Sequence, residues 1–172
     1  LLRADMDGLP MEETTGLDFA AKGDTAHMCG HDAHAAMLLG AARILKEMED
    51  ELPGTVKLMF QPGEETFEGA RAAIADGLLQ NPRPQAAFAM HVNSQSPLGL
   101  VLYGSPALSG VYGFRITLQG KGGHGSSPEI CIDPITAGVH VHLALQELIS
   151  RAVPAAKEVA LTVGKFAGGQ PA

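Results

Sequence analysis

The chain has 172 residues, 45% of them hydrophobic, which is enough to bury a core in one or two small domains. Its net charge of −7 argues against nucleic acid or an anionic membrane as the main partner. No apolar run approaches the roughly 20 residues that a bilayer-spanning helix needs.

Hydrophobic periodicity predicts an alternation of strands and helices in the first part of the chain. The expected order is strand, helix, strand, helix and strand, over residues 1–4, 33–48, 55–60, 68–79 and 86–92. Asp32 is the expected N-cap of the first helix. The almost unbroken apolar run of 86–92 is typical of a strand that is covered on both faces. We therefore expect an α/β domain with a mostly parallel sheet and flanking helices.

The pattern changes near residue 108, which we interpret as a boundary between a domain over 1–108 and a smaller one over 109–172. Alternating apolar residues predict half-exposed strands over 114–119 and 159–163. Between them a helix is expected to begin at Pro134, with Asp133 as its N-cap. The second domain is therefore expected to be α+β.

Two cysteines, Cys29 and Cys131, give little support for a disulfide scaffold. A bridge between them would close a loop of about a hundred residues. It would also consume the Cys29 thiol, which belongs to a motif of potential metal ligands. A reducing, cytoplasmic location is the corresponding expectation.

That motif, residues 28–34, holds a thiol, two imidazoles and a carboxylate. Cys29 and His31 are two residues apart, so in an extended loop both side chains would project to one side. A thiolate can bridge two metal ions, and imidazole suits zinc, manganese, cobalt or nickel. A lone Cys-x-His is more often structural, so this pair alone does not establish a metal site.

Two further groups of potential ligands follow apolar strands. Glu64 and Glu65 come after Pro62-Gly63, and His91 ends the run of 86–92. In extended backbone the two glutamates would point apart, which suits one as a metal ligand and the other as a general base. A glutamate pair is usually a solvated surface and a buried histidine is usually part of a core. Because each group lies at a strand or helix end, their combination favours a metal site.

Other polar residues allow more than one interpretation. Asp5 and Asp7 suit a turn, or they orient a histidine that binds metal. The spacing of His27 and His34 does not demand that they are ligands. On the helix of the second domain, we interpret His140 and His142 as surface or packing residues.

Together these motifs resemble the amidohydrolase branch of the aminoacylase-type metallopeptidases. This branch includes hippurate hydrolase, auxin–amino acid conjugate hydrolases and N-acetyl-diaminopimelate deacetylase. The segments that carry the resemblance are residues 3–10, 28–34, 61–65 and 90–92, followed by 120–126 and 133–135. The last two resemble the start of the family's lid or dimerisation domain.

The resemblance implies a site with two divalent cations, which could be zinc, manganese, cobalt or nickel. Cys29 would bridge them, His31 and His91 would each bind one, and Glu65 would be a carboxylate ligand. Glu64 would be the general base, taking a proton from a metal-bridged water and passing it to the leaving amine of a small N-acyl amino acid. His124 would reach the partner subunit's site in a homodimer formed through the lid, where it would stabilise the oxyanion.

Members of that family are longer than this chain, so the resemblance implies an internal fragment of the catalytic and lid domains. Strands before residue 3 and one further histidine ligand would lie outside it. Two alternatives remain open: a non-catalytic metal-binding or dimerisation module, and an enzyme with Cys29 as nucleophile and His31 as base. Chelation distinguishes the second of these, because a thiol enzyme should survive metal removal.

Overall fold

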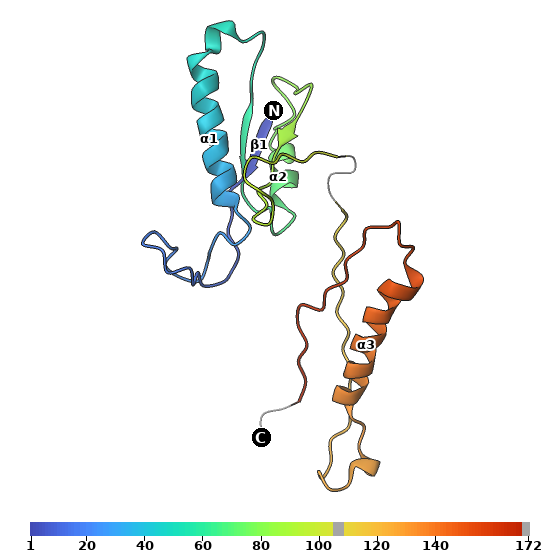
Figure 1. Cartoon of the computed structure of the whole chain (residues 1–172). Coiled ribbons are helices and arrows are strands. Elements are labelled where there is room, and N and C mark those ends of the chain that lie inside the picture. The colour runs from blue at the N-terminus through green and yellow to red at the C-terminus, as the bar shows by residue number, and fades with distance from the viewer. Residues whose placement is uncertain (105–108, 170–172) are drawn as a thin grey trace. The chain divides into compact units, whose positions relative to one another are not determined.

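The computed structural model describes residues 1–104 and 109–169, and the chain divides into two units, Leu1–Leu102 and Tyr103–Ala172 (Figure 1). The predicted boundary near residue 108 falls outside the described residues.

The first unit is built on a parallel sheet of three strands with the order β2-β1-β3. The central strand β1 (Leu2–Asp5) pairs with β2 (Leu58–Gln61) on one side and with β3 (Phe88–Ala89) on the other. Both pairings are parallel, so the three strands end at the same edge of the sheet. This confirms the predicted α/β class and the parallel sheet.

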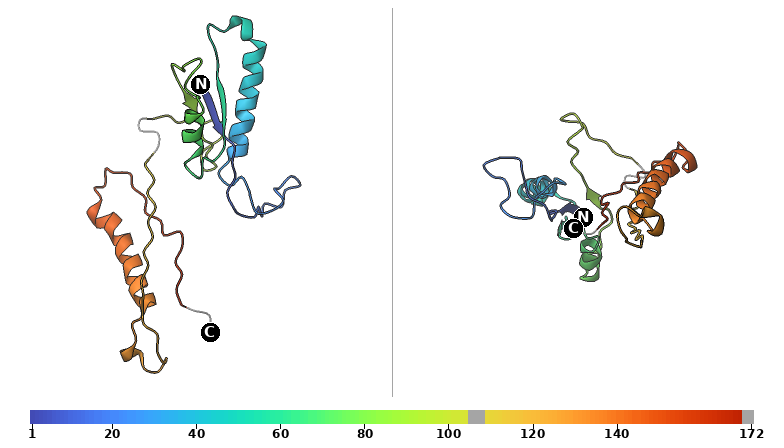
Figure 2. Two further views of the ribbon diagram at one scale, coloured as in Figure 1. Left: turned by 180° about the vertical axis from the view of Figure 1, so that it is seen from behind. Right: turned by 90° about the horizontal axis from the view of Figure 1, so that it is seen from below.

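Helices α1 (His31–Glu47) and α2 (Gly69–Ala75) cover opposite faces of this sheet (Figure 2). Leu2 and Ala4 line a hollow together with Leu38 of α1. Met59 of β2 lines a different hollow together with Ile74 of α2. A short 3₁₀ helix, Glu49–Glu51, follows α1.

Three predicted elements of this unit are shorter than expected. β2 covers only part of 55–60 because its parallel register with β1 starts at Leu58, opposite Leu2. α2 ends before residue 79 because Gly77, with φ of 93°, leaves the helical conformation. β3 is a two-residue edge strand and Phe88 is 60% exposed, so the prediction of a strand covered on both faces is wrong for the described residues.

The start of α1 also differs from the prediction. The N-cap is Gly30, in the left-handed conformation with φ of 80°, and it makes no side-chain capping bond. Asp32 lies inside the first turn, where its negative charge still interacts favourably with the positive end of the helix dipole. The backbone of residues 28–34 is therefore bent at Gly30 and not extended as we predicted.

The second unit contains helix α3 (Pro134–Ala152) and a short 3₁₀ helix, Pro128–Ile130. The predicted N-cap is present: Asp133 accepts hydrogen bonds from the backbone N–H groups of Ile135 (2.8 Å) and Thr136 (3.3 Å). Gly138 leaves room on α3 for the Phe166 ring, whose nearest atom would be 3.1 Å from an added Cβ.

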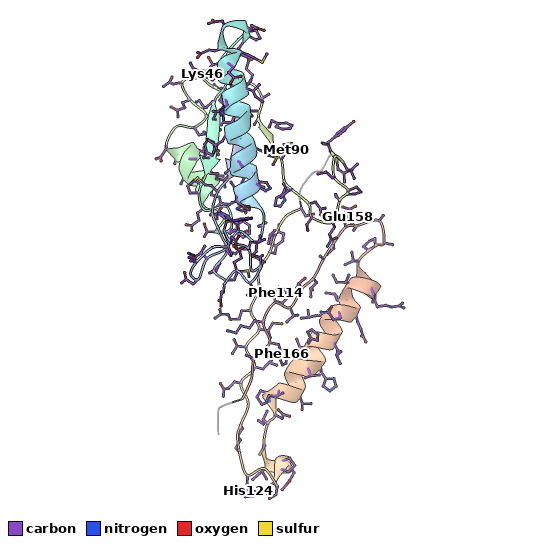
Figure 3. All side chains as sticks on the ribbon, turned by 60° about the vertical axis from the view of Figure 1, so that its left-hand side comes forward. Lys46, Met90, Phe114, His124, Glu158 and Phe166 are labelled. Carbon is purple, nitrogen blue, oxygen red and sulfur yellow. The ribbon has the colours of Figure 1, made fainter. Side chains whose placement is uncertain are left out.

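The strands predicted over 114–119 and 159–163 are absent from the structure of residues 109–169, which has no β-strand. Alternating side chains alone do not make a strand, because its backbone must hydrogen-bond to a neighbour, and neither segment has one there. Figure 3 labels Phe114, where the first segment begins, and Phe166, three residues after the second segment ends. Of the predicted α+β unit, the helix is therefore confirmed, and the strands are absent from the described residues.

Within the part of the chain that the structure describes, no helix is both long and apolar enough to cross a membrane.

Candidate metal centre

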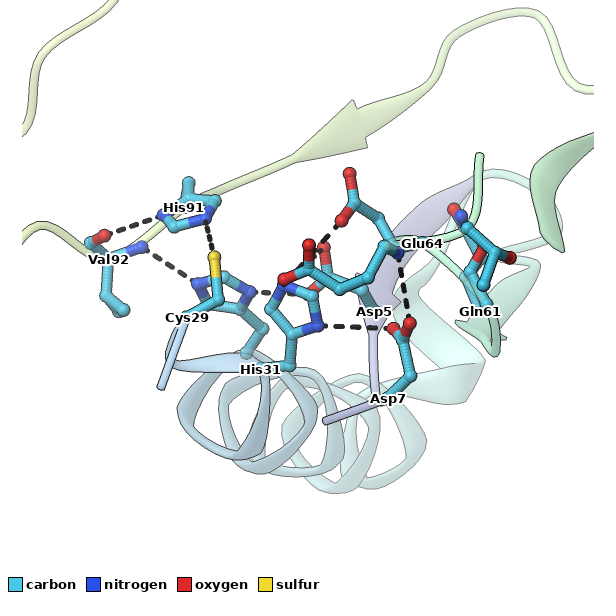
Figure 4. A network of polar contacts seen from close by, with 12 residues as sticks. Asp5, Asp7, Cys29, His31, Gln61, Glu64, His91 and Val92 are labelled. Atoms are coloured by element: carbon cyan, nitrogen blue, oxygen red, sulfur yellow. Dashed lines mark hydrogen bonds and ion pairs between the residues drawn. The ribbon is translucent and has the colours of Figure 1, made fainter. Parts of the chain in front are cut away.

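The candidate residues of the first unit gather where the three parallel strands end (Figure 4). Asp5 is the last residue of β1 and Asp7 follows it, whereas Glu64 and Glu65 follow β2 and His91 follows β3. Cys29 and His31 reach the same place from the start of α1. Open α/β sheets bind ligands at this edge because the loops there converge.

His31 is central to the cluster and is almost fully buried, at 1% exposure. Its Nδ1 lies 3.2 Å from Oδ1 of Asp7. An ionised carboxylate can only accept, so Nδ1 donates to it, and in the neutral ring Nε2 keeps a lone pair. Asp7 also accepts the backbone N–H of Glu65 at 3.0 Å. Burial by itself raises the pKa of Asp7, but the backbone N–H groups of Glu65 and Glu64 and the His31 hydrogen bond leave it lowered.

His91 and Cys29 form the second part of the cluster. The Nδ1–H of His91 donates to the carbonyl of Val92 at 2.7 Å, so in the neutral ring the lone pair is on Nε2. That nitrogen lies 3.4 Å from Sγ of Cys29 (Figure 4). Sγ of Cys29 and nitrogen atoms of His31 and His91 all lie within 4.8 Å of one another. In their neutral forms the two histidines therefore both present Nε2 as the unprotonated nitrogen, which is the form that binds metal.

The donor atoms around His31 fit a cation. Its Nε2 is buried without a hydrogen-bond partner among the described residues. Oxygens of Asp5, Glu64 and Glu65 lie 3.7, 3.9 and 3.8 Å from it, too far for hydrogen bonds. A lone pair surrounded by carboxylates is unfavourable unless positive charge lies between them. Separations near 3.5 Å are roughly what two ligands of one zinc ion have, given bonds of about 2.1 Å.

The Cys29 thiol gives the same indication. Burial raises the pKa of this thiol, and the negative charges of Glu65, Glu64 and Asp5 raise it further. Reactive cysteines have the opposite environment, with cations that lower the thiol pKa. A divalent cation in the cluster would offset these carboxylates and favour the thiolate.

The glutamate pair differs from the prediction. Residues 64–67 form a turn, in which the carbonyl of Glu64 accepts the N–H of Phe67 at 2.9 Å. In a turn, adjacent side chains can converge, and both carboxylates lie near Nε2 of His31. The expectation that Glu64 and Glu65 point apart is therefore wrong.

His34 is the residue that sequence reasoning missed. It is 2% exposed, and its Nδ1 donates to Oδ1 of Asp5 at 2.5 Å. We expected Asp5 to orient a metal-binding histidine, but its hydrogen bonds are with His34 and with the Arg3 guanidinium at 2.8 Å. Burial raises the pKa of Asp5, but the His34 hydrogen bond and the charge of Arg3 outweigh it and leave that pKa lowered. Helical spacing was the available signal, since His34 lies one turn after His31.

Gly30 allows the two halves of the cluster to meet. An added Cβ at this position would lie 2.4 Å from Cγ2 of Val92, the residue after His91. The positive φ of Gly30 is itself unfavourable for other residues. The missing side chain at Gly30 lets Val92, and with it His91, lie close to the start of α1.

We expect Gly30→Ala to destabilise the metal-free protein by about 1–3 kcal/mol, because the methyl group meets Val92 and the left-handed backbone is strained. Gly40→Ala is the matched control, since its Cβ would meet nothing within 4 Å and alanine favours a helix by about 0.5–1 kcal/mol. Urea unfolding measures both. Equal effects of the two substitutions would contradict the argument.

The remaining predicted residue, His124, lies in the second unit. It is exposed in the loop that precedes the short 3₁₀ helix (Figure 3), and its Nδ1 is 2.8 Å from the Ser126 hydroxyl. His140 and His142 lie on α3, where the His142 ring packs edge-on against Phe166 with centroids 6.3 Å apart. Both cysteines are free thiols.

Comparison with known proteins places this cluster in a wider context. The chain is 46% identical over 170 residues to IAA-amino acid hydrolase ILR1-like 4 of Arabidopsis thaliana. This alignment covers 98% of the chain and 38% of that protein. It is 43% identical over 170 residues to N-acetyl-L-cysteine deacetylase of Bacillus subtilis, and this alignment covers 98% of the chain and 40% of that protein. The chain thus spans about two fifths of the length of these relatives.

A solved structure is also similar to part of the chain. The YxeP protein of Bacillus subtilis, described as a dinuclear metal binding peptidase from the M20 family, superposes with a TM-score of 0.53 and 46% identity. The superposition covers 56% of this chain and 26% of that protein. The model of peptidase family M20/M25/M40 matches residues 1–171, and the chain belongs to this family.

Proposed function

We propose that the intact protein is a metal-dependent amidohydrolase that releases an amino acid from a small N-acyl amino acid. The observation that carries the proposal is the unpartnered Nε2 of His31 among three carboxylates and the nearby thiol. The names of two relatives, an IAA-amino acid hydrolase and an N-acetyl-L-cysteine deacetylase, support this substrate class.

Cys29, His31, Glu65 and His91 are the proposed ligands of two divalent cations, with Cys29 as the bridge. Similarity to a dinuclear metal binding peptidase supports the number of ions. When bound, such cations polarise an acyl carbonyl and lower the pKa of water from about 16 toward 7.

Glu64 is the proposed general base. It takes a proton from the attacking water and delivers it to the nitrogen of the leaving amine. Its side chain is partly exposed and its carboxylate lies 3.9 Å from Nε2 of His31, so it can face both the metal ligands and a substrate. Asp7 orients His31 through Nδ1 and holds the Glu65 backbone.

His124 is proposed to act across a homodimer, where it stabilises the oxyanion in the partner subunit's site. Support comes from its exposed position in a glycine-rich loop, since such a loop can approach another surface closely. The cytoplasmic location also remains a prediction.

Chelation followed by metal replacement tests the proposal. We expect hydrolysis of N-acetyl amino acids by the intact protein to be lost with its metal and restored by zinc, manganese, cobalt or nickel. Activity that persists in the fully metal-free protein would instead support Cys29 as a nucleophile. Two bound ions without turnover of any N-acyl amino acid would support the non-catalytic module.

A further inference from the structure

The segment that carries His91 is not held by the sheet. The pairing of β3 with β1 ends at Ala89, opposite Arg3, two residues before His91. His91 itself is exposed in the chain described here, whereas His31 is buried within the first turn of α1. The position of the His91 side chain therefore depends on contacts other than strand pairing.

The His34 ring supplies such a contact. The backbone N–H of Val92 donates to Nε2 of His34 at 2.9 Å. On the other side of the same residue, the Val92 carbonyl accepts the Nδ1–H of His91 at 2.7 Å. The rings of His34 and His91 also pack edge-to-face, with centroids 4.6 Å apart. The residue after His91 is thus hydrogen-bonded at both its N–H and its carbonyl.

Both neighbours of His34 require the same tautomer. The backbone N–H of Val92 can only donate, so Nε2 of His34 must be unprotonated. The Asp5 carboxylate accepts from Nδ1, and Asp5 is itself fixed by the Arg3 guanidinium. A chain of contacts therefore runs from Arg3 through Asp5, His34 and Val92 to His91.

We propose that His34 is a positioning residue that fixes the metal-binding nitrogen of His91 through the backbone of Val92. Because Nδ1 of His91 is bonded to the Val92 carbonyl, and His34 holds the N–H of the same residue, the placement of the Val92 backbone sets the direction of Nε2 of His91 toward Cys29. The inference rests on the proposed metal site and adds a residue that does not itself bind the ion.

Two substitutions separate the contacts of His34. In His34→Gln the amide oxygen can occupy the place of Nε2 and still accept from Val92, whereas in His34→Asn the amide can occupy the place of Nδ1 and still donate to Asp5. Metal-free intact protein is titrated with Co²⁺ and followed by cobalt absorption, which includes the thiolate band from Cys29. His27→Asn is the control, because His27 is exposed on the same motif.

We expect His34→Asn to weaken the binding of one of two Co²⁺ ions by about 10–100-fold and to alter its spectrum, and His34→Gln to restore most of the affinity. Unchanged Co²⁺ binding in His34→Asn, or equal losses in both variants, would overturn the inference while leaving the proposed function intact. Wild-type protein that takes up no Co²⁺ would overturn the proposed function and this inference with it.

A measurement on the wild-type protein avoids any effect of the substitutions on folding. Imidazole ¹⁵N shifts of histidine-labelled protein report which ring nitrogen is protonated. We expect His34 to carry its proton on Nδ1 with Nε2 free, and a proton on Nε2 would overturn the inference.

Discussion

Replacing Glu64 with glutamine is expected to lower kcat for N-acyl amino acids by about 10²–10⁴-fold while both metal ions stay bound. Glutamine keeps the size of the side chain and can still hydrogen-bond to a substrate, but it cannot take a proton from water. Steady-state kinetics and metal analysis of the same sample measure the two quantities.

The adjacent residue offers a matched control. Glu64 and Glu65 lie at similar distances from Nε2 of His31, 3.9 and 3.8 Å, so distance alone does not separate their roles. Two other contacts do separate them: the Glu65 backbone is bonded to Asp7, and the Glu65 carboxylate is the charge that most raises the Cys29 pKa. We therefore expect Glu65→Gln to lose metal and activity together.

Each result for the pair has a distinct meaning. Loss of metal in Glu64→Gln with metal retained in Glu65→Gln would exchange the two roles. Near wild-type turnover in Glu64→Gln with metal bound would show that neither the proposed base nor its proton transfer is correct.

The fold was predictable where the signal is local. The apolar spacing of 33–48 predicted α1 to within two residues at its start and one at its end, because an amphipathic helix follows from its own sequence. The ends of the strands were not predictable from sequence, because they depend on where a neighbouring strand offers hydrogen bonds. The residues 114–119 alternate as a strand does, yet lack a pairing partner among the residues described.

The candidate site shows the same division. Cys29, His31 and Glu65 could be proposed from donor type and from their places at element ends. The role of His34 could not, because it depends on a hydrogen bond to Val92, 58 residues farther along the chain. The turn at Glu64 and Glu65 was missed because the pair was placed in extended backbone at the end of a strand, whereas residues 64–67 form a tight turn directly after Pro62-Gly63.

The second large effect is expected from Asp7, whose carboxylate serves two proposed ligands at once. One oxygen accepts from Nδ1 of His31 and the other from the backbone N–H of Glu65. Asparagine has one accepting oxygen and one donating NH₂ group, so Asp7→Asn can keep only one of the two bonds.

We expect Asp7→Asn to weaken zinc affinity by about 10–100-fold, measured by competition with a chelating indicator. If the amide NH₂ faces His31, the ring must move its proton to Nε2, the nitrogen proposed to bind metal. If it faces Glu65 instead, two donors meet and the 64–67 turn shifts. Asp18→Asn removes the same charge from an exposed site in the loop between Asp7 and Cys29, and it should leave zinc affinity unchanged. Equal affinities in the two variants would mean that Asp7 shapes the turn without orienting a metal ligand.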